Sequence, residues 1–382
     1  MARQFGIYLH VPFCSTRCGY CDFNTYTAED LGGGATREAY PAQAAAEIRL
    51  AAGMLRGPDG PPQVATVFVG GGTPTLLTPT ELGGLLGVIR SEFGLSADAE
   101  VTTEANPESV DAAAIEQLRA VGFTRISFGM QSARAHVLGV LDRVHTPGRS
   151  AQCVAWAHQA GFEHVNLDLI YGTPGESDAD WSDSLAAAVA AGPDHISAYS
   201  LIVEDGTRLA ARIRRRELPA PDSDVLADRY LMAEQALSTA GFTWYEVSNW
   251  ARGDAARCRH NILYWTDGDW WGIGPGAHSH RDGVRWWNVR HPRDYAQRLA
   301  ALESPEAGRE VLTEHQRQLE YVMLGLRLRA GLPVDRVPDA DLALHRAAAD
   351  GLLEPAALAG GHAVLTLRGR LLADAVVRDL TG

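Results

Sequence analysis

Between Tyr8 and Phe23 the sequence reads YLHVPFCSTRCGYCDF, and three of the five cysteines in this chain of 382 residues fall within it. Cys14, Cys18 and Cys21 follow a short apolar run, so one loop after a strand can turn three thiolates toward a common point. A [4Fe-4S] cluster normally takes four thiolates, and three would leave one iron open to a small chelating molecule. The stretch therefore predicts a [4Fe-4S] cluster with one iron not bound by the protein.

Two other kinds of cysteine site compete with this interpretation. A zinc site would normally use CxxC pairs or a clear histidine partner, and His10 or Asp22 could complete one here. A disulfide would need an oxidising compartment. An odd count of five cysteines fits a metal site in a reducing compartment better than a disulfide framework.

The composition is that of a globular protein, with 46% hydrophobic and 21% charged residues. A formal net charge of −13 argues against a general nucleic-acid-binding surface, which is usually basic. The sequence contains no lysine, which excludes a Schiff-base lysine and a Walker-type phosphate loop. Because no signal-peptide core and no long apolar run occur, we expect a cytoplasmic protein without a transmembrane segment.

Short β-branched or aromatic runs alternate with longer Ala- and Leu-rich amphipathic runs over residues 5 to 202, which is typical of βα units around a parallel sheet. The predicted strands are Phe5–Val11, Val64–Gly70, Glu100–Glu104, Arg125–Met130, His164–Ile170 and His195–Ile202. The predicted helices between them are Glu38–Leu55, Thr80–Phe93, Val110–Val121, Arg149–Ala160 and Asp178–Ala191. Six such units form a partial, open (β/α)6 version of the (β/α)₈ barrel.

Polar or glycine-rich residues follow the predicted strands, where the βα loops of such barrels carry the chemistry. Three glycines let a backbone approach a ligand closely, and carboxylates such as Glu104 and Asp168 suit hydroxyl or amino groups. Taken singly, each of these residues is more often a solvated strand end than a ligand contact. Together with the cysteine loop they favour one binding site, formed by Gly70–Thr75, Glu104–Pro107, Gln131, Ser132, Asp168 and Tyr171–Gly175.

The motif CxxxCxYC, with an aromatic residue before its third cysteine, resembles the signature of the radical SAM superfamily. The resemblance implies that S-adenosylmethionine (SAM) binds the open iron through its amino and carboxylate groups. It also implies that the cluster and SAM supply the radical chemistry, while the protein supplies ligation and orientation.

Residues 1 to about 280, and less distinctly the remainder, resemble the oxygen-independent coproporphyrinogen III dehydrogenase (oxidase-like) family and its HemW group of haem chaperones. The resemblance implies cluster ligation by Cys14, Cys18 and Cys21. It implies SAM binding by Tyr8, Tyr20, Gly71, Gly72, Thr73, Glu104, Gln131, Arg143 and Asp168. Ile202 is a weaker match to a residue that contacts a second SAM.

Two departures from the dehydrogenases put decarboxylation of a porphyrinogen in doubt. The dehydrogenases carry a further cysteine two residues after the third ligand, where this chain has Phe23. They also carry an N-terminal arm, whereas only seven residues precede Tyr8 here. The sequence from Cys21 to Asn24 has the form seen in the HemW group, so we expect a haem chaperone, with the dehydrogenase as the alternative.

A second motif follows a polar, arginine-rich segment (203–218), a predicted helix (Ser223–Ala240) and a predicted strand (Trp244–Val247). The run His-Asn-x-x-Tyr-Trp, which begins at His260, resembles the hallmark of HemW, in which this histidine binds haem. Imidazole is a common ligand of haem iron, and aromatic neighbours suit the macrocycle. A hydrogen-bonded core histidine remains the alternative. His278 and His280 are lesser candidates, and Cys153 and Cys258 are expected to be small buried hydrophobes.

From Pro292 onward we expect helices, then a small hairpin near His362–Thr366 and a last helix, as in a winged-helix module used as a lid or docking surface. The predicted divisions are a partial barrel (1–210), an extension carrying the histidine motif (211–305) and the C-terminal module (306–382). The implied partners are haem, haem-accepting respiratory proteins, an electron donor for the cluster and a second copy of the chain as a homodimer; nucleic acid is not expected.

Overall fold

The computed structural model describes residues 3–27, 35–143, 145–337 and 340–382, and it contains the predicted parallel sheet. Six strands lie side by side in chain order, each parallel to the next. They are β1 (Phe5–Val11), β2 (Val64–Gly71), β3 (Leu95–Ala105), β4 (Arg125–Gln131), β5 (His164–Tyr171) and β6 (His195–Ser200). The strand predictions are confirmed to within a few residues, with β3 beginning earlier than expected. The α/β fold class with a partial barrel is therefore confirmed.

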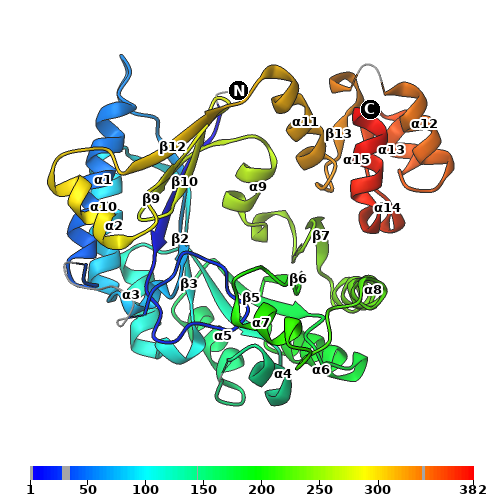
Figure 1. Ribbon diagram of the computed structural model, residues 1–382, viewed down its shortest axis with the longest axis horizontal. Helices are drawn as coiled ribbons and strands as arrows, with labels where there is room; N and C mark the ends of the chain where they lie inside the picture. Colours follow the sequence, from blue (N-terminus) through cyan, green and yellow to red (C-terminus); the bar gives the residue numbers. More distant parts are fainter. Residues whose placement is uncertain (1–2, 28–34, 144, 338–339) are drawn as a thin grey trace.

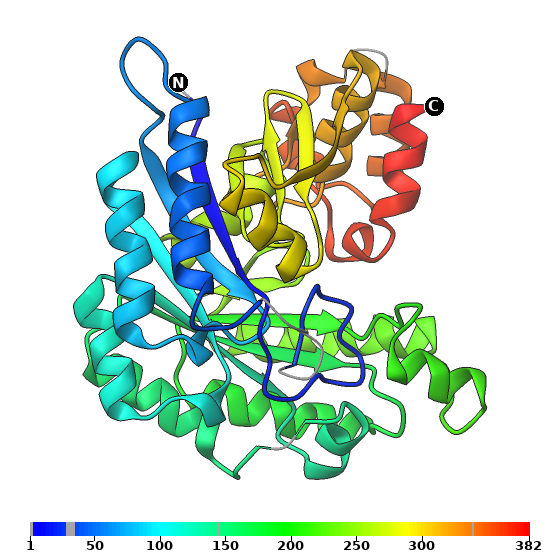
Figure 2. The same ribbon diagram turned by 60° about the vertical axis from the view of Figure 1, so that its left-hand side comes forward.

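The connecting helices cover one face of this sheet, as Figures 1 and 2 show for α1, α2 and α3. Side-chain caps start several of them: Thr78 and Ser177 form capping boxes, and Asp111 accepts from the amide of Ala114. The helices are α1 (Tyr40–Met54), α2 (Pro79–Glu92), α3 (Ala112–Val121), α4 (Ala135–Val140), α5 (Arg149–Gln159) and α6 (Asp178–Ala190).

The sheet extends beyond the barrel strands at both edges, giving twelve strands in the order β12-β11-β10-β9-β1-β2-β3-β4-β5-β6-β8-β7. At one edge β9 (Asp269–Ile273) pairs parallel with β1, and β10 (His278–Arg281), β11 (Val284–Asn288) and β12 (Glu306–Val311) follow antiparallel. At the other edge lie β8 (Asn249–Ala251) and β7 (Thr243–Glu246). The expectation that the chain is helical from Pro292 onward was wrong for β12, a charged edge strand with little apolar pattern.

The remaining helices fall into two groups: α7 to α10 follow the barrel, and α11 to α15 form a C-terminal unit. They are α7 (Arg208–Arg214), α8 (Ser223–Thr239), α9 (Arg259–Trp265), α10 (Pro292–Ala300), α11 (Glu314–Gly325), α12 (Asp341–Ala349), α13 (Pro355–Ala359), α14 (Leu367–Leu371) and α15 (Ala373–Thr381). In the C-terminal unit Val322, Leu344 and Val376 belong to a hydrophobic cluster of its own, and Figure 1 shows these helices gathered at one end of the molecule. A short ladder joins β13 (Leu332–Pro333) to β14 (His362–Ala363). The expected hairpin is present as an antiparallel bridge between Leu353 and Leu365.

Within the described ranges, no helix combines the length and the apolar character needed to cross a membrane.

A buried carboxylate joins α1 to the extended edge of the sheet. Glu47 accepts hydrogen bonds from the amide of Gly274 at 2.7 Å, the side-chain amide of Asn288 at 2.7 Å and the hydroxyl of Tyr295 at 2.6 Å. Burial raises the pKa of Glu47 to about 7. One side chain thus satisfies donors from the loop after β9, from β11 and from α10.

We predict that Glu47→Ala lowers the free energy of unfolding by about 3 kcal/mol, because it leaves three buried donors without an acceptor. Glu38→Ala is the matched control, since Glu38 is exposed just before α1, and a change within about 0.5 kcal/mol is expected there. Urea unfolding followed by circular dichroism measures both. Equal stability of the two variants would contradict this role for Glu47.

Candidate functional site

The loop that carries the three cysteines, residues 12–27, is fixed by main-chain hydrogen bonds at the carboxyl ends of β1 and β2. The amide of Cys14 donates to Tyr26 at 3.0 Å, and the amide of Thr73 donates to Phe13 at 2.7 Å. At Gly72 an added Cβ would lie 2.4 Å from the carbonyl oxygen of Phe13 and 3.0 Å from Sγ of Cys14. Glycine at this position therefore lets β2 approach the first cysteine closely.

The far side of this cysteine loop rests on α4 and α7. Gly19 donates its amide to Leu141 at 3.1 Å and accepts from the amide of Leu209 at 2.8 Å. A guanidinium nitrogen of Arg143 lies 3.4 Å from Sγ of Cys18. A positive charge therefore lies beside a sulfur that would be negatively charged as an iron ligand.

The five cysteines are all free, and they fall into two groups. Cys14, Cys18 and Cys21 are partly exposed, whereas Cys153 and Cys258 are buried. The disulfide alternative is therefore not realised, and the prediction that Cys153 and Cys258 are buried is confirmed.

One cavity of about 750 Å³ contains the three loop cysteines together with most of the predicted SAM residues. Its lining includes Tyr20, Gly71, Gly72, Thr73, Glu104, Gln131, Arg143, Asp168 and Ile202. Tyr8 lies outside this lining; its hydroxyl is 2.9 Å from Nδ1 of His10, and its ring stacks on Phe68. The structure thus gathers the residues from five strand ends and the cysteine loop around a single space.

Two carboxylates meet in the inner part of this cavity. Burial, followed by the nearby charge of Asp168, raises the pKa of Glu104 to about 8. Burial also raises the pKa of Asp168, although its carboxylate accepts from Ser127 at 2.7 Å and from Asn166 at 2.8 Å. Burial makes both acids costly to ionise, and a ligand with hydroxyl or ammonium donors would relieve that cost.

A glutamine at the end of β4 is hydrogen-bonded to an arginine that follows α4. Gln131 has a positive φ of 58°, and its side-chain oxygen accepts from Arg143 at 3.1 Å. Arg143 also donates to the carbonyl oxygen of Gly129 at 3.2 Å, and a Cβ at Gly129 would lie 2.7 Å from this guanidinium. The strained Gln131 and the small Gly129 therefore aim a guanidinium into the cavity, where it suits a carboxylate.

The donor set fits a cluster with SAM better than a single metal ion. In the described ranges no three His, Cys, Asp or Glu side chains converge closely enough to hold one metal ion, as zinc would require. In a [4Fe-4S] cluster each thiolate binds a different iron, so the sulfurs need to border one cavity without meeting at one point. Acids for hydroxyl and amino groups and a guanidinium for a carboxylate complete the set that SAM needs.

His260, the predicted haem ligand, lies in the core rather than in this cavity. It is 1% exposed, and its ring nitrogens lie 2.8 Å from the hydroxyl of Thr66 and 2.8 Å from the hydroxyl of Tyr264. Glu100 holds the start of α9 by accepting from the amide of His260 at 3.1 Å. Burial lowers the pKa of His260 to about 3. An iron atom could bind this imidazole only after one hydroxyl partner had moved away.

Several residues near the cavity were not found from the sequence. The side-chain amide of Asn166 donates to Asp168, and its side-chain oxygen lies 2.6 Å from a ring nitrogen of His195. His195 and Asn166 together therefore orient the carboxylate of Asp168. The alternation of Asn166 and Asp168 along β5 was the available signal, because both face the same side of a strand. Tyr199 and Val247 also line the cavity, and they gave no sequence signal.

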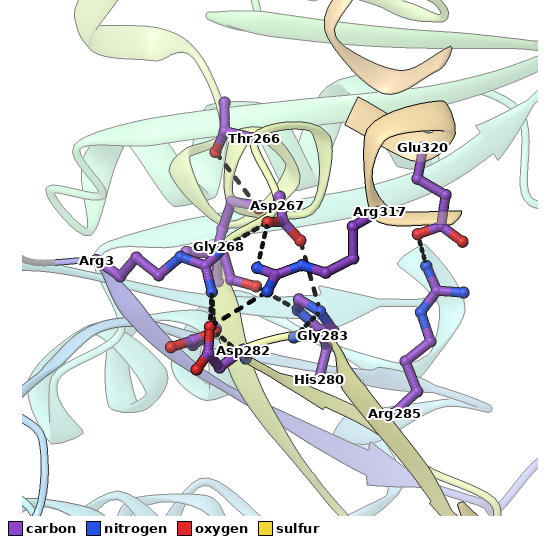
Figure 3. Close-up of polar contacts among 12 residues, drawn as sticks. Arg3, Thr266, Asp267, Gly268, His280, Asp282, Gly283, Arg285, Arg317 and Glu320 are labelled. Atoms are coloured by element: carbon purple, nitrogen blue, oxygen red, sulfur yellow. Dashed lines mark hydrogen bonds and ion pairs between the residues drawn. The ribbon is translucent and has the colours of Figure 1, made fainter. Parts of the chain in front are cut away.

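A second cleft, of about 670 Å³, lies where the N-terminal segment meets α11. Figure 3 shows Arg3 and Arg317 both reaching Asp267 and Asp282, while Arg285 pairs with Glu320. Asp267 also lies beside His280. This histidine is buried and accepts a hydrogen bond from the amide of Gly283. Because these charges neutralise one another, the network holds the C-terminal unit to the β9–β10 hairpin and is better explained as structural.

We predict that Glu104→Gln removes a pH dependence of stability measured without SAM. The pKa of Glu104 is raised in the folded state, so the unfolded chain ionises first as pH rises. Wild-type stability should then fall between about pH 4.5 and pH 8, and the variant should fall less. Urea unfolding at pH 5 and pH 8 tests this, with Glu116→Gln on α3 as the control. Parallel pH profiles for wild type and Glu104→Gln would refute it.

Comparison with known proteins places this geometry in a family. The model of the radical SAM superfamily matches residues 8–188. The protein "Heme chaperone HemW" of Mycobacterium tuberculosis (strain H37Rv) is 55% identical over 381 residues, which cover 100% of this chain and 95% of the relative. The protein of the same name from Escherichia coli (strain K12) is 35% identical, covering 76% of this chain and 75% of the relative.

Two further comparisons bear on the fold. The solved structure of coproporphyrinogen III oxidase (HemN) from Escherichia coli superposes with a TM-score of 0.81 at 23% identity, covering 99% of this chain and 90% of that chain. A mitochondrial radical S-adenosyl methionine domain-containing protein 1 from mouse is 38% identical over 73% of this chain and 61% of its own length. The chain belongs to the HemW family of the radical SAM superfamily.

Proposed function

We propose that this protein is a haem chaperone that holds a [4Fe-4S] cluster and SAM, binds haem and delivers it to haem-dependent respiratory proteins. The observation that carries the proposal is the meeting of Cys14, Cys18 and Cys21 with the SAM-type residues around one cavity, in a chain 55% identical to a named haem chaperone over its full length. The experiments below test the cluster ligands and the binding of haem.

Each side chain of the cavity has a physical role in this proposal. The three cysteines bind three irons, and the guanidinium of Arg143 lies beside the Cys18 sulfur. Glu104 and Asp168 accept hydrogen bonds from hydroxyl and amino groups of SAM, and Tyr20, packed against Leu141 and Leu201, covers the adenine. When bound, the cluster and SAM supply one-electron chemistry that side chains lack. An electron donor and a haem acceptor are therefore the expected protein partners.

The alternative function is oxygen-independent oxidative decarboxylation of coproporphyrinogen III. The resemblance of the fold to HemN supports this alternative. Phe23, where the dehydrogenases carry a further cysteine, speaks against it, and this side chain is 57% exposed at the cavity. We therefore favour the chaperone and test the alternative directly.

We predict that anaerobically reconstituted wild-type protein shows a broad visible iron–sulfur absorbance and that Cys14→Ser, Cys18→Ser and Cys21→Ser each lose it. Cys153→Ser and Cys258→Ser are the matched controls and should keep it, because both thiols are buried away from the loop. Absorbance with iron and sulfide counting makes the measurement. Zinc without visible absorbance in the wild type, or loss of iron in the two control variants, would remove the cluster from the proposal.

We further predict that the reconstituted protein binds haem in a titration at the Soret band and does not convert coproporphyrinogen III under the same reducing, SAM-containing conditions. Both assays are run on one preparation, so that an inactive sample cannot explain the second result. Formation of protoporphyrinogen would reject the chaperone in favour of the dehydrogenase. Absence of haem binding would reject the chaperone without supporting the alternative.

A further inference from the structure

His145 lies next to a residue of the SAM site and is not itself assigned to any ligand. It belongs to the segment between α4 and α5, and its Nε2 lies 3.2 Å from the side-chain oxygen of Gln131. The next residue anchors it, because the amide and the hydroxyl of Thr146 donate to the two carboxylate oxygens of Glu108, at 2.7 Å and 3.0 Å. Glu108 itself lines the cavity. The imidazole is therefore held against the end of β4.

The neighbouring groups fix which nitrogen of His145 carries the hydrogen. A guanidinium can only donate, so the atom of Gln131 that lies 3.1 Å from Nε of Arg143 is the side-chain oxygen. Burial, followed by the charge of Arg143, lowers the pKa of His145 to about 4, so its imidazole is neutral near pH 7 and has one N–H. Because Nε2 faces the same oxygen, this N–H is on Nε2 and donates to Gln131. The side-chain oxygen of Gln131 thus accepts from two donors.

Two nitrogens that carry hydrogens come together over Gly129. A Cβ at Gly129 would lie 2.5 Å from the side-chain nitrogen of Gln131 and 2.7 Å from a guanidinium nitrogen of Arg143. All three residues line the cavity, and Gln131 is 6% exposed. Glycine therefore leaves room for a side-chain NH2 group and a guanidinium side by side, and both can only donate. A carboxylate is the ligand group that such a pair suits.

The side-chain amide of Gln131 needs a support that does not depend on the ligand. Turned by half a rotation, the same amide would present its oxygen instead of its nitrogen beside the guanidinium. Arg143 opposes this turn before a ligand binds, but its guanidinium is also the group that would move to bind a ligand carboxylate. His145 lies outside the cavity lining, so its hydrogen bond to the Gln131 oxygen can persist when the ligand is bound.

We infer that His145 is a positioning residue for the carboxylate of SAM: its Nε2–H holds the side-chain oxygen of Gln131, so that the NH2 group of Gln131 and the guanidinium of Arg143 together bind that carboxylate. The inference rests on the proposed function, in which SAM occupies the cavity. Within the described part of the chain, Nδ1 of His145 is buried without a hydrogen-bond partner, which costs free energy. The hydrogen bond that Nε2 donates explains why a histidine stands there in spite of this cost.

The test is anaerobic calorimetric titration of the full, reconstituted chain with SAM. His145→Leu removes the donor, and His145→Gln is the conservative variant, because its amide nitrogen is as many bonds from Cα as Nε2 of histidine. His164→Leu is the matched control, since His164 is also partly buried but begins β5, at the end of the strand away from the cavity. Gln131→Leu and the double variant Gln131→Leu/His145→Leu show whether His145 acts through the glutamine. Iron counting and circular dichroism confirm that each variant keeps its cluster and fold.

We expect His145→Leu to bind SAM at least about fivefold more weakly than wild type, since one hydrogen bond no longer orders the amide. His145→Gln and His164→Leu should bind within about twofold of wild type, and the double variant within about twofold of Gln131→Leu. Wild-type affinity in His145→Leu, an equal loss in His145→Gln, or a second full loss in the double variant would overturn the inference. A wild-type protein that binds no SAM would overturn the proposed function itself.

Discussion

Main-chain hydrogen bonds between the cysteine loop and the carboxyl ends of β1 and β2 are the constraint on which the rest of the site depends. A loop of this length with three polarisable thiols has no regular structure of its own, and its backbone groups must find partners elsewhere. The amide of Thr73 donates to the carbonyl oxygen of Phe13, the amide of Gly72 donates to that of Val11, and Cys14 pairs with Tyr26 within the loop. They place the loop at the edge of the sheet where β3, β4 and β5 deliver Glu104, Gln131 and Asp168.

The extension supports this loop from behind. The side-chain amide of Asn24 donates to the carbonyl oxygens of Pro275 at 3.0 Å and Arg290 at 2.8 Å. A Cβ at Gly276, which has a φ of +73°, would lie 2.6 Å from that amide nitrogen. The glycine-rich run after β9 therefore packs against the cysteine loop, and the added strand β9 beside β1 brings it there. Barrel and extension therefore share one sheet.

Local patterns in the sequence were sufficient for the barrel and insufficient for the edges of the sheet. The strands Phe5–Val11 and His164–Ile170 were predicted closely because buried parallel strands form short, continuous apolar runs. The pairing of β9 with β1 joins residues more than 260 positions apart, and no local periodicity records it. The strand Glu306–Val311 was missed because an exposed edge strand rich in Glu and Arg lacks an apolar alternation. Similarly, Val247 reaches the cavity only because a turn beside β6 carries it there.

For the site, too, local sequence predicted some features and not others. The cysteine spacing and the residues after each strand predicted which side chains would meet, since parallel strands bring their carboxyl ends to one edge. Burial, however, depends on packing from distant elements: His260 is enclosed by Thr66 from β2 and Tyr264 from its own helix, and its motif alone did not reveal this. Conversely, Tyr199 and Val247 reach the cavity from separate segments, and no motif marks them.

The most direct test of the central claim is electron paramagnetic resonance of the reduced, reconstituted protein recorded with and without SAM. If Cys14, Cys18 and Cys21 hold three irons and the fourth faces the residues of the cavity, the spectrum is that of a [4Fe-4S]⁺ cluster and its g values shift when SAM is added. The control is Cys153→Ser, whose spectra should match the wild type under both conditions. A cluster signal that SAM leaves unchanged in the wild type would contradict an open iron facing this cavity, and with it the shared site on which the account depends.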